Sequence, residues 1–376
     1  MSEQQATIRS VAVAAGVSMS TVSNVLSGRH EQMAPETRER VLAAIASLDY
    51  QPNHAARSLV TKRTATIGLI MSEVTNSLYP PVTVGAEEAC RQAGYGLLLA
   101  NAEDADSERR GVDLMRAKRV DALVVFAVSL LGADSQQLYA AQAAGMPVVV
   151  INRDLPGDAP LSAVWFDHQA GGRMATHHLV ELGHRRIAHI AGPANRMTGI
   201  QRRQGYETAL AAAGIPLQSS LVATGDYSFA SGERLMQQLW RERPTAVFVA
   251  GDAMALGAMR ALVGLGVRVP DDLSLVAFGN PDFVRYATPA ITTIDLPVAM
   301  AGQVAVELAL RRMQRPEEKE VRMLDTSLLI RSTTAPPGGR KGVASLAGRG
   351  EIRYPGDNVI DFSTDGKGAR HGHVDV

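Results

Sequence analysis

Short apolar runs alternate with longer amphipathic stretches from Thr64 to about Thr334, and this alternation restricts the possible folds more than any other feature of the chain. The runs are TIGLIM (66–71), YGLLLA (95–100), DALVVFAV (121–128), PVVVIN (147–152), and then AVWF, RIAHIAG, SLVAT, TAVFVAG and LSLVAFG. Nearly continuous apolar strands separated by helices are typical of parallel sheets covered on both faces. There are more such units than one doubly wound sheet usually holds, so we predict an α/β core of two lobes. Ligands of such sheets bind at the carboxyl ends of the strands, which here would face a cleft between the lobes.

Residues 1 to about 60 show short helical patterns and no convincing strand. A first helix is predicted to start at Ile8 with Thr7 as its N-cap, and a second helix has Ser18 as its cap and Gly28 at its end. Apolar side chains recur at helical spacing at Ile8, Val11, Ala12 and Ala15 and, after Gly16, at Val22, Val25 and Leu26. Two short helices joined through a glycine are typical of a helix-turn-helix.

The spacing around Gly16 suits DNA binding. Small Ala12 allows the helices to pack closely, Gly16 allows a tight turn, and Val22 fixes the second helix. The outward face of that helix is then Met19, Ser20, Ser23 and Asn24, small or polar side chains that fit a major groove. Seven basic side chains against four acidic ones over 8–63 support this interpretation without deciding it. The alternative is an ordinary αα-hairpin within a core.

Two further segments complete the N-terminal part. A third helix, PETRERVLAAIASLDY, begins at Pro35, with Val41, Leu42, Ile45 and Leu48 as its predicted buried stripe. The segment Asn53–Val60 favours a helix but is too short to be stable alone, so we expect it to order only against a partner.

Composition excludes several classes of protein. Lys plus Arg equals Asp plus Glu at 38 each, so net charge indicates no nucleic-acid or membrane partner, although a small basic module would be averaged away. The single Cys90 excludes a disulfide framework and a cysteine zinc cluster. The N-terminus lacks a signal-peptide core and no apolar run is long enough for a membrane span, so a cytoplasmic protein is expected.

Motifs for other chemistry are missing from the sequence. His177, His178, His184 and His189 lack metal-ligand spacing, so we interpret them as solvated or helix-end histidines and expect no metal. No phosphate-binding glycine motif and no nucleophile elbow occurs, and we expect no cofactor.

Eight stretches in order resemble the lactose-repressor (LacI/GalR) family of bacterial transcription regulators. They are VAVAAGVSMSTVSNVLSG, PETRERVLAAIASLDYQPNHAARSL, TIGLIM, HLVELGHRRIAHIAGP, RRQGYETALAAAGI, DAMALGAMRAL, VRVPDDLSLVAF and TPAITTIDLPV. The resemblance covers residues 7 to about 334.

The resemblance implies a fold that agrees with the reading of the residues. It consists of an all-α helix-turn-helix headpiece and a two-lobed core of parallel sheets like the type I periplasmic binding proteins. The implied boundaries are 1–52 for the headpiece, 53–63 for a hinge helix or linker, 64–163 with 297–323 for the N-lobe, 164–296 with 324–334 for the C-lobe, and 335–376 for a tail. The tail is Gly-rich and lacks leucine heptads, so we expect it to be disordered.

The resemblance also implies the residues that contact operator DNA. They are Thr7, Met19, Ser20, Thr21, Ser23, Asn24, Asn53, His54, Ala56 and Leu59. Leu59 matches a hinge-helix leucine that wedges between base steps in the minor groove. Asn24 departs from the arginine common at its position, and asparagine suits adenine where arginine suits guanine, so a different half-site preference is expected.

Effector contacts implied by the resemblance come from the core. They are Tyr79, Arg153, Arg196, Thr198, Arg202, Asp252 and Asn280. Most members have an aspartate where this chain has Asn280. Arginines without that carboxylate favour an anionic effector such as a sugar acid or sugar phosphate. The alternative is that Asn280 replaces the lost acceptor and the effector is a neutral sugar.

Three functional classes can therefore be compared. A solute-binding protein with this core would carry a signal peptide and lack the headpiece, and an α/β enzyme would show a catalytic constellation. The sequence instead meets the requirements of a non-enzymatic regulator, which the resemblance makes a homodimeric repressor of a carbohydrate-utilisation operon. Whether the effector releases or recruits the protein stays open.

Overall fold

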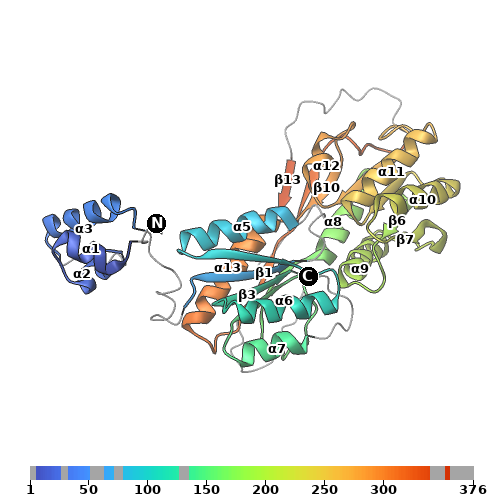
Figure 1. Ribbon diagram of the computed structural model, residues 1–376. Coiled ribbons are helices and arrows are strands. Elements are labelled where there is room, and N and C mark those ends of the chain that lie inside the picture. The colour runs from blue at the N-terminus through green and yellow to red at the C-terminus, as the bar shows by residue number, and fades with distance from the viewer. Residues whose placement is uncertain are drawn as a thin grey trace, which may run out of the picture. The chain divides into compact units, whose positions relative to one another are not determined.

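The computed structural model describes residues 6–26, 33–50, 63–71, 79–126, 135–338 and 352–355. The chain divides into two compact units, Met1–Ala65 and Thr66–Val376 (Figure 1). We call the first the headpiece and the second the core.

The described helices of the headpiece are α1 (Ile8–Ala15), α2 (Met19–Leu26) and α3 (Pro35–Ser47). Their apolar faces meet in one cluster formed by Val11, Ala12, Ala15, Val22, Val25, Val41 and Ala44. The predicted stripe of α3 is partly wrong, because Leu42 is 46% exposed and Leu48 is also exposed, whereas Ala44 is buried. Because α3 packs closely against α1 and α2, its inward position is occupied by the small side chain of Ala44.

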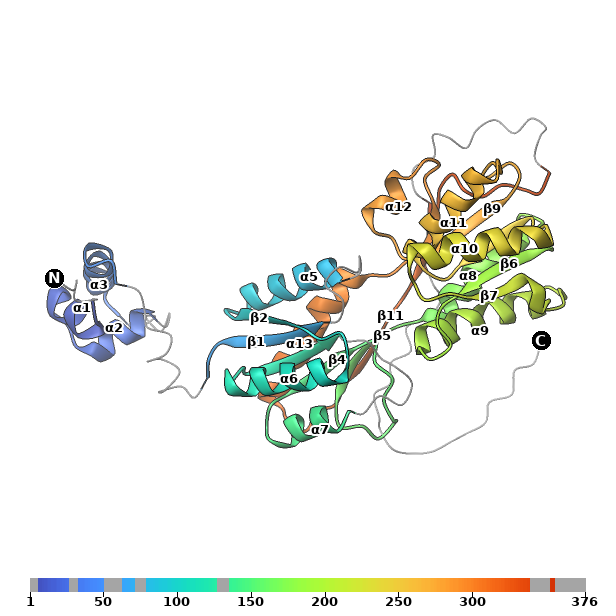
Figure 2. The same cartoon turned by 45° about the vertical axis from the view of Figure 1, so that its right-hand side comes forward.

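The first lobe of the core, the N-lobe, is a parallel sheet between two layers of helices. Among the described residues its strands have the order β11-β5-β4-β3-β1-β2. Its elements are β1 Thr66–Met71, α5 Tyr79–Gln92, β2 Gly96–Asn101, α6 Ala105–Ala117, β3 Ala122–Phe126, α7 Gln136–Ala143, β4 Val148–Ile151, β5 Ser162–Phe166, α13 Val298–Gln314 and β11 Val321–Leu324. Helices α5 and α13 cover one face, and α6 and α7 cover the other (Figure 2).

The second lobe, the C-lobe, repeats this arrangement with an antiparallel edge. Its described strands have the order β13-β12-β10-β9-β8-β6-β7, and β12 pairs antiparallel with both of its neighbours, β10 and β13. Its elements are α8 His168–Glu181, β6 Ile187–Ala191, α9 Met197–Ala212, η1 Ser219–Leu221, β7 Val222–Thr224, α10 Phe229–Leu239, η2 Trp240–Glu242, β8 Ala246–Val249, α11 Asp252–Gly264, β9 Ser274–Phe278, α12 Asp282–Tyr286, β10 Thr292–Asp295, β12 Ser327–Ile330 and β13 Ile352–Pro355. Helices α8 and α9 lie on one face, and α10 and α11 on the other.

The chain passes between the two sheets after β5, after β10 and after β11. The predicted lobe boundaries at 163 and 323 fall inside strands, because β5 continues to Phe166 and pairs with β11 up to Leu324. Both boundaries are therefore a few residues too early. The predicted boundary at 296 lies between β10 and α13.

The tail departs from the predicted disorder at two places. Ala335 is fixed by Ser274, since its N–H donates to Ser274 Oγ (3.0 Å) and its carbonyl accepts from the same hydroxyl (2.9 Å). Residues 352–355 form β13, which pairs antiparallel with β12. An edge strand offers unpaired backbone groups, and a later segment of the same chain occupies them here.

Candidate functional site

The turn between α1 and α2 has the geometry that the sequence predicts. Gly16 ends α1 in the left-handed conformation (φ 63°), and its N–H donates to the carbonyl of Val13. Thr7 caps the start of α1, where its hydroxyl accepts from the Ser10 N–H at 3.2 Å. Ala12 and Val22 are both buried between the helices. The predicted roles of these residues in the turn are confirmed.

The outward face of α2 is open to solvent. Met19 is 52% exposed, and Ser20, Ser23 and Asn24 are also exposed. Ser18 caps this helix, since its Oγ accepts from the Thr21 N–H (3.1 Å) and lies 2.9 Å from Thr21 Oγ1. A helix with a fixed first turn and small polar side chains on its free face can enter a major groove. The other predicted DNA contacts, Asn53, His54, Ala56 and Leu59, lie outside the described residues.

A second cluster of predicted residues lies in the C-lobe, at the carboxyl ends of β6, β8 and β9. Arg202 of α9 is at its centre and only 5% exposed. Its Nη1 donates to the carbonyl of Ala250 (2.6 Å), and its guanidinium lies 3.8 Å from the ring centroid of Phe278. Burial lowers the pKa of Arg202, while Tyr227 and Asp252 act in the opposite direction. The guanidinium is thus held in place without a direct ion pair being required.

Tyr227 forms one wall of this cluster. Its hydroxyl lies 3.0 Å from Thr198 Oγ1, and Arg196 lies 5.8 Å from its ring centroid. Its backbone has φ 71°, which is uncommon for an aromatic residue and typical of functional sites. A Cβ on Gly192 would overlap the Tyr227 hydroxyl, so the glycine makes room for the ring.

Asp252 and Asn280 are the two remaining predicted effector contacts of the C-lobe. Asp252 begins α11 and faces Gly279, where an added Cβ would lie 3.0 Å from Asp252 Oδ2. Asn280 follows Gly279, and its Oδ1 accepts from Arg331 Nη2 at 2.7 Å. Its acceptor atom is therefore already engaged within the protein.

His168 connects the cluster to the N-lobe. It is the first residue of α8 and 1% exposed. Its Nδ1 lies 3.4 Å from Arg202 Nε, and its Nε2 lies 2.8 Å from Oδ1 of Asn152, which follows β4. Burial lowers the pKa of His168 well below its usual range, and the nearby charge of Arg202 lowers it further.

Two predicted effector contacts have other partners. Tyr79 is buried, with its ring centroid 4.8 Å from that of Phe126 in the N-lobe core. Arg153 is 2% exposed; its Nη1 donates to Glu108 Oε2 at 2.7 Å and its Nε to Ser135 Oγ at 3.1 Å. The structure does not bring these two side chains into the Arg202 cluster.

The expectation of an anionic effector rests on the aspartate that is missing at Asn280. The structure shows two other carboxylates near the predicted arginines, since Arg153 pairs with Glu108 and the charge of Asp252 favours that of Arg202. Asp252 was among the predicted effector contacts, whereas Glu108 lies on another element and no spacing in the sequence indicated it.

Sequence reasoning missed Tyr227, His168 and Phe278. The last two residues were detectable in principle, because His168 follows β5 and Phe278 ends β9 on the side of the predicted cleft. Tyr227 follows β7 and its unusual backbone leaves no mark in the sequence.

Of the four histidines predicted to be solvated or at a helix end, His178 lies in the last turn of α8, and it is buried, as are His184 and His189. His178 Nε2 lies 3.0 Å from Thr334 Oγ1, and His184 contacts Thr245 and Ser274 at 2.9 and 3.0 Å. His189 is fully buried, and only His177 is exposed. In the described part of the chain, no group of three or more His, Cys, Asp or Glu side chains is arranged to hold a metal ion. Within those residues, no helix is both long and apolar enough to cross a membrane.

Two family models match this chain. Residues 7–53 match the family described as bacterial regulatory proteins, lacI family, and residues 176–334 match the periplasmic binding protein-like domain. The first match contains α1 to α3, and the second contains Thr198, Arg202, Tyr227 and Phe278.

Individual relatives extend over nearly the whole chain. The HTH-type transcriptional regulator CelR of Thermobifida fusca is 36% identical over 87% of this chain and 98% of its own length. The HTH-type transcriptional repressor PurR of Photobacterium profundum is 34% identical over 87% of this chain and 98% of its own length. The lac repressor dimer bound to operator and the anti-inducer ONPF is 31% identical, with a TM-score of 0.77, over 88% of this chain and 100% of that chain.

A complex of CelR with cellobiose has a TM-score of 0.67 and 33% identity over 88% of this chain and all of the other. These relatives are transcriptional regulators and not enzymes, and they share both the headpiece and the core. The chain therefore belongs to the lacI family of bacterial DNA-binding transcriptional regulators.

Proposed function

We propose that this protein represses a carbohydrate-utilisation operon by binding a near-palindromic operator as a homodimer in the cytoplasm, under control of a sugar in the cleft of the core. The observation that carries this proposal is the exposed polar face of α2, fixed to α1 through Gly16 and Val22. The relatives support it, since the lac repressor is known bound to operator and CelR bound to cellobiose.

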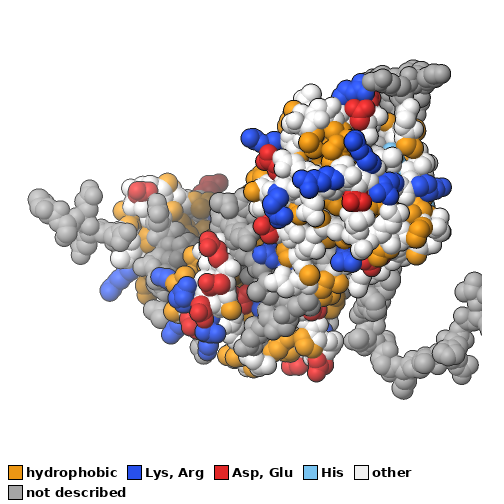
Figure 3. Space-filling model, turned by 90° about the vertical axis from the view of Figure 1, so that its right-hand side faces the viewer, with side chains coloured by type: hydrophobic (Ala, Val, Ile, Leu, Met, Phe, Trp, Pro, Cys, Tyr) orange, Lys and Arg blue, Asp and Glu red, His pale blue; other side chains and the backbone are white. Residues whose placement is uncertain are grey.

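We assign DNA affinity to the headpiece, because the part of the C-lobe surface in view carries charges of both signs. Figure 3 shows Lys and Arg side chains interspersed with Asp and Glu over the visible face of the C-lobe. Ion pairs of the C-lobe include Arg186 with Glu242 and Arg268 with Asp272. A surface of mixed sign attracts a polyanion weakly.

A neutral sugar fits the C-lobe cluster better than an anion. The ring of Tyr227 offers an apolar face, while Thr198, Arg196 and Asp252 offer hydroxyl, donor and acceptor groups around it. A ligand with both apolar faces and many hydroxyl groups matches this mixture. Asp252 offsets part of the positive charge of Arg196 and Arg202, which lowers the attraction of the cluster for a ligand carboxylate or phosphate.

Operator binding in the presence of sugars tests this proposal. We expect a neutral disaccharide such as cellobiose to bind in calorimetric titration at least tenfold more tightly than a matched sugar acid or sugar phosphate, and to change operator affinity in a gel-shift. Asp252→Asn should weaken the binding of the neutral sugar and strengthen the binding of the acidic one, because it removes a negative charge from the cluster. Tighter binding of the acidic sugar by the unmodified protein would contradict the assignment of a neutral effector.

Asn24 should set one base of the half-site. An asparagine amide pairs with adenine through two hydrogen bonds, and an arginine pairs with guanine, each pair contributing about 1–3 kcal/mol of discrimination. Asn24 is exposed on α2, so Asn24→Arg should shift one position of the preferred half-site from adenine to guanine without affecting folding. Selection from randomised duplexes with both proteins measures the shift, and identical selected sequences would contradict it.

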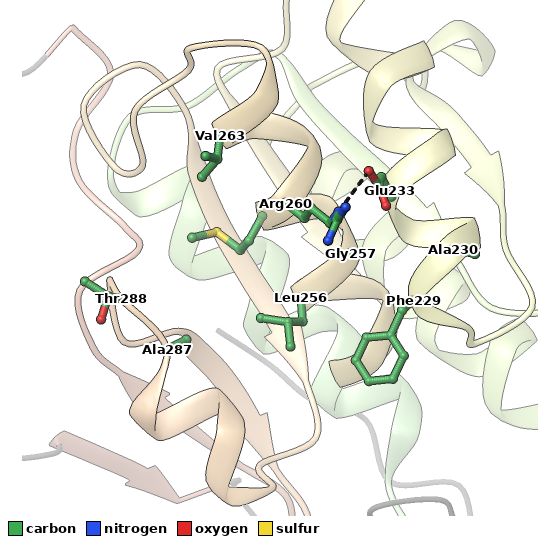
Figure 4. A pocket seen from close by; sticks show the side chains of 10 residues that line it. Phe229, Ala230, Glu233, Leu256, Gly257, Arg260, Val263, Ala287 and Thr288 are labelled. Carbon is green, nitrogen blue, oxygen red and sulfur yellow. Dashed lines mark hydrogen bonds and ion pairs between the residues drawn. The ribbon is translucent and has the colours of Figure 1, made fainter.

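The homodimer requires a surface for a second copy, and the described part of the C-lobe offers one. A hollow of about 660 Å³ lies between α10, α11 and the segment after α12, lined mainly by apolar side chains (Figure 4). Phe229 is 52% exposed and Val263 74% exposed, and the Arg260–Glu233 ion pair (3.2 Å) lies among them. Exposed apolar patches of this kind mark association surfaces, and a two-fold interface would use the same patch on both copies.

Val263→Glu should break the dimer. Because Val263 is exposed, the substitution leaves the fold of one copy intact, whereas in a two-fold interface it places two charges on an apolar surface. We expect the dissociation constant to rise by about 100-fold or more, measured by analytical ultracentrifugation. Leu217→Glu, at another exposed apolar side chain, is the matched control and should leave the dimer unchanged. An equally stable dimer of Val263→Glu would place the interface elsewhere.

A further inference from the structure

The imidazole of His168 joins the two lobes of the core at the point where the chain first crosses between them. His168 lies two residues after the end of β5 and begins α8. One ring nitrogen contacts Arg202 in the C-lobe, and the other contacts Asn152 in the N-lobe. The ring also lies between Phe166 and Phe278, at 6.0 and 5.7 Å between centroids.

The partners fix the direction of these hydrogen bonds. The Nε and Nη2 of Arg202 can only donate, so Nδ1 of His168 accepts, at 3.4 and 3.3 Å. The ring proton is therefore on Nε2, which donates to Asn152 Oδ1 at 2.8 Å. Since burial and the charge of Arg202 lower the pKa of His168, the ring stays neutral and keeps this tautomer.

Asn152 is held firmly by the N-lobe. Its N–H donates to the carbonyl of Val164 in β5 at 2.8 Å, and its φ of 54° lies in the left-handed region that asparagine tolerates. The next residue, Arg153, is buried against Glu108 of α6. The amide oxygen that His168 contacts therefore moves with the N-lobe sheet and α6.

Arg202 is held by a short bond on one side and by long ones on the other. Its bond to the Ala250 carbonyl is 2.6 Å, whereas both contacts to His168 are at the long end of the hydrogen-bond range. A ligand that draws the guanidinium toward Tyr227 and Asp252 would thus break the contacts to His168 first.

We infer that His168 is a positioning residue that couples Arg202 at the effector site to Asn152 of the N-lobe. Effector binding withdraws a donor from Nδ1, and the ring then reorients away from Asn152, which releases one hydrogen bond between the lobes. Coupling between two sites needs a group that contacts both of them, and His168 is in contact with Arg202 and with Asn152. This inference rests on the proposed function, because the effector and the operator are assigned there.

Two substitutions at Asn152 separate this coupling from a merely structural role. Asn152→Gly removes the amide and suits the positive φ, while Asn152→Asp keeps an oxygen acceptor for the His168 N–H. Neither changes a residue that we assign to operator or sugar contact. We expect the ratio of operator affinities with and without cellobiose to fall by about 5-fold or more toward one in Asn152→Gly, and to be retained in Asn152→Asp. Affinity for cellobiose itself should change less than this ratio.

A second readout needs no effector. In full-length protein labelled with ¹⁵N-asparagine, Arg202→Lys should shift the side-chain amide signal of Asn152, and this shift should vanish when His168→Phe is added. If cellobiose leaves operator binding of the unmodified protein unchanged, the sugar proposal fails while the amide signal still decides the role of His168. An Asn152 signal that responds to Arg202→Lys equally with and without His168, or an unaltered affinity ratio in Asn152→Gly, would overturn the inference.

Discussion

Glu108→Ala should lower the free energy of unfolding by about 3–5 kcal/mol, because it removes the carboxylate that faces a buried arginine. Arg153 Nη1 lies 2.7 Å from Glu108 Oε2, and the two side chains are 3% and 6% exposed. Glu108 also accepts from Gln137 Nε2 at 2.8 Å, so α6, the start of α7 and the segment after β4 meet at one carboxylate. Urea unfolding followed by circular dichroism measures the loss.

An exposed ion pair provides the matched control. Arg203 and Glu207 of α9 pair at 2.7 Å but are 45% and 35% exposed, so Glu207→Ala should cost less than about 1 kcal/mol. The double variant Glu108→Leu with Arg153→Met should recover most of the stability, because it removes both buried charges. If Glu108→Ala cost no more than Glu207→Ala, the buried pair would not hold the N-lobe together.

This pair shows how far the sequence alone predicts the site. The position of Arg153 at the end of a strand was predictable from the apolar run before it. Its partner Glu108 is 45 residues earlier, on helix α6, and no local pattern shows which charged side chains will be buried together. The same holds for Asn280, whose partner Arg331 immediately follows β12.

The fold could be predicted from the sequence more completely than the site, because apolar periodicity is a local property of the chain. The apolar runs predicted as strands do form β1, β3, β4, β8 and β9, and the two predicted sheets are present. The errors lie where tertiary packing decides: SLVAT begins as the 3₁₀ helix η1, Leu42 faces outward, and residues 352–355 add a strand to β12. In each case the deciding partner is distant in the sequence.

The histidines are the clearest example, and they make stability sensitive to acid. His184 was expected to be solvated or at a helix end, and its ring in fact contacts Thr245, Ser274 and the carbonyl of Ala335. Burial lowers the pKa of His178 to about 4 and that of His189 to about 3, and it lowers the pKa values of His168 and His184 as well. These groups are thus neutral in the folded protein at pH values where an unfolded chain would bind protons.

The sign of the effect follows from this difference. An unfolded histidine has a pKa of about 6.5, so below that pH the unfolded chain binds more protons than the folded one and stability falls as pH falls. Each histidine contributes about 1.4 kcal/mol per pH unit until its folded pKa is reached. At pH 5 the loss is about 2 kcal/mol each for His178 and His189. Above pH 7 these groups should contribute no pH dependence.

The window between pH 5 and pH 6.5 isolates this effect, because carboxyl groups with pKa values near about 4 titrate mostly below it. His189→Phe is the sharpest test, since the ring is stacked between Tyr206 and Phe248 at 4.7 Å from each centroid. Its Nδ1 donates to the Phe248 carbonyl (2.9 Å), and within the described residues its Nε2 has no hydrogen-bond partner and would have to be protonated without one. Phenylalanine keeps the stack, gives up one hydrogen bond at every pH, and removes the titration.

The free energy of unfolding, measured by chemical unfolding, should therefore differ between pH 7 and pH 5 by about 2 kcal/mol less in His189→Phe than in the unmodified protein. An unchanged difference would mean that His189 takes up its proton without unfolding the C-lobe, so that the cost of acid is carried by other groups.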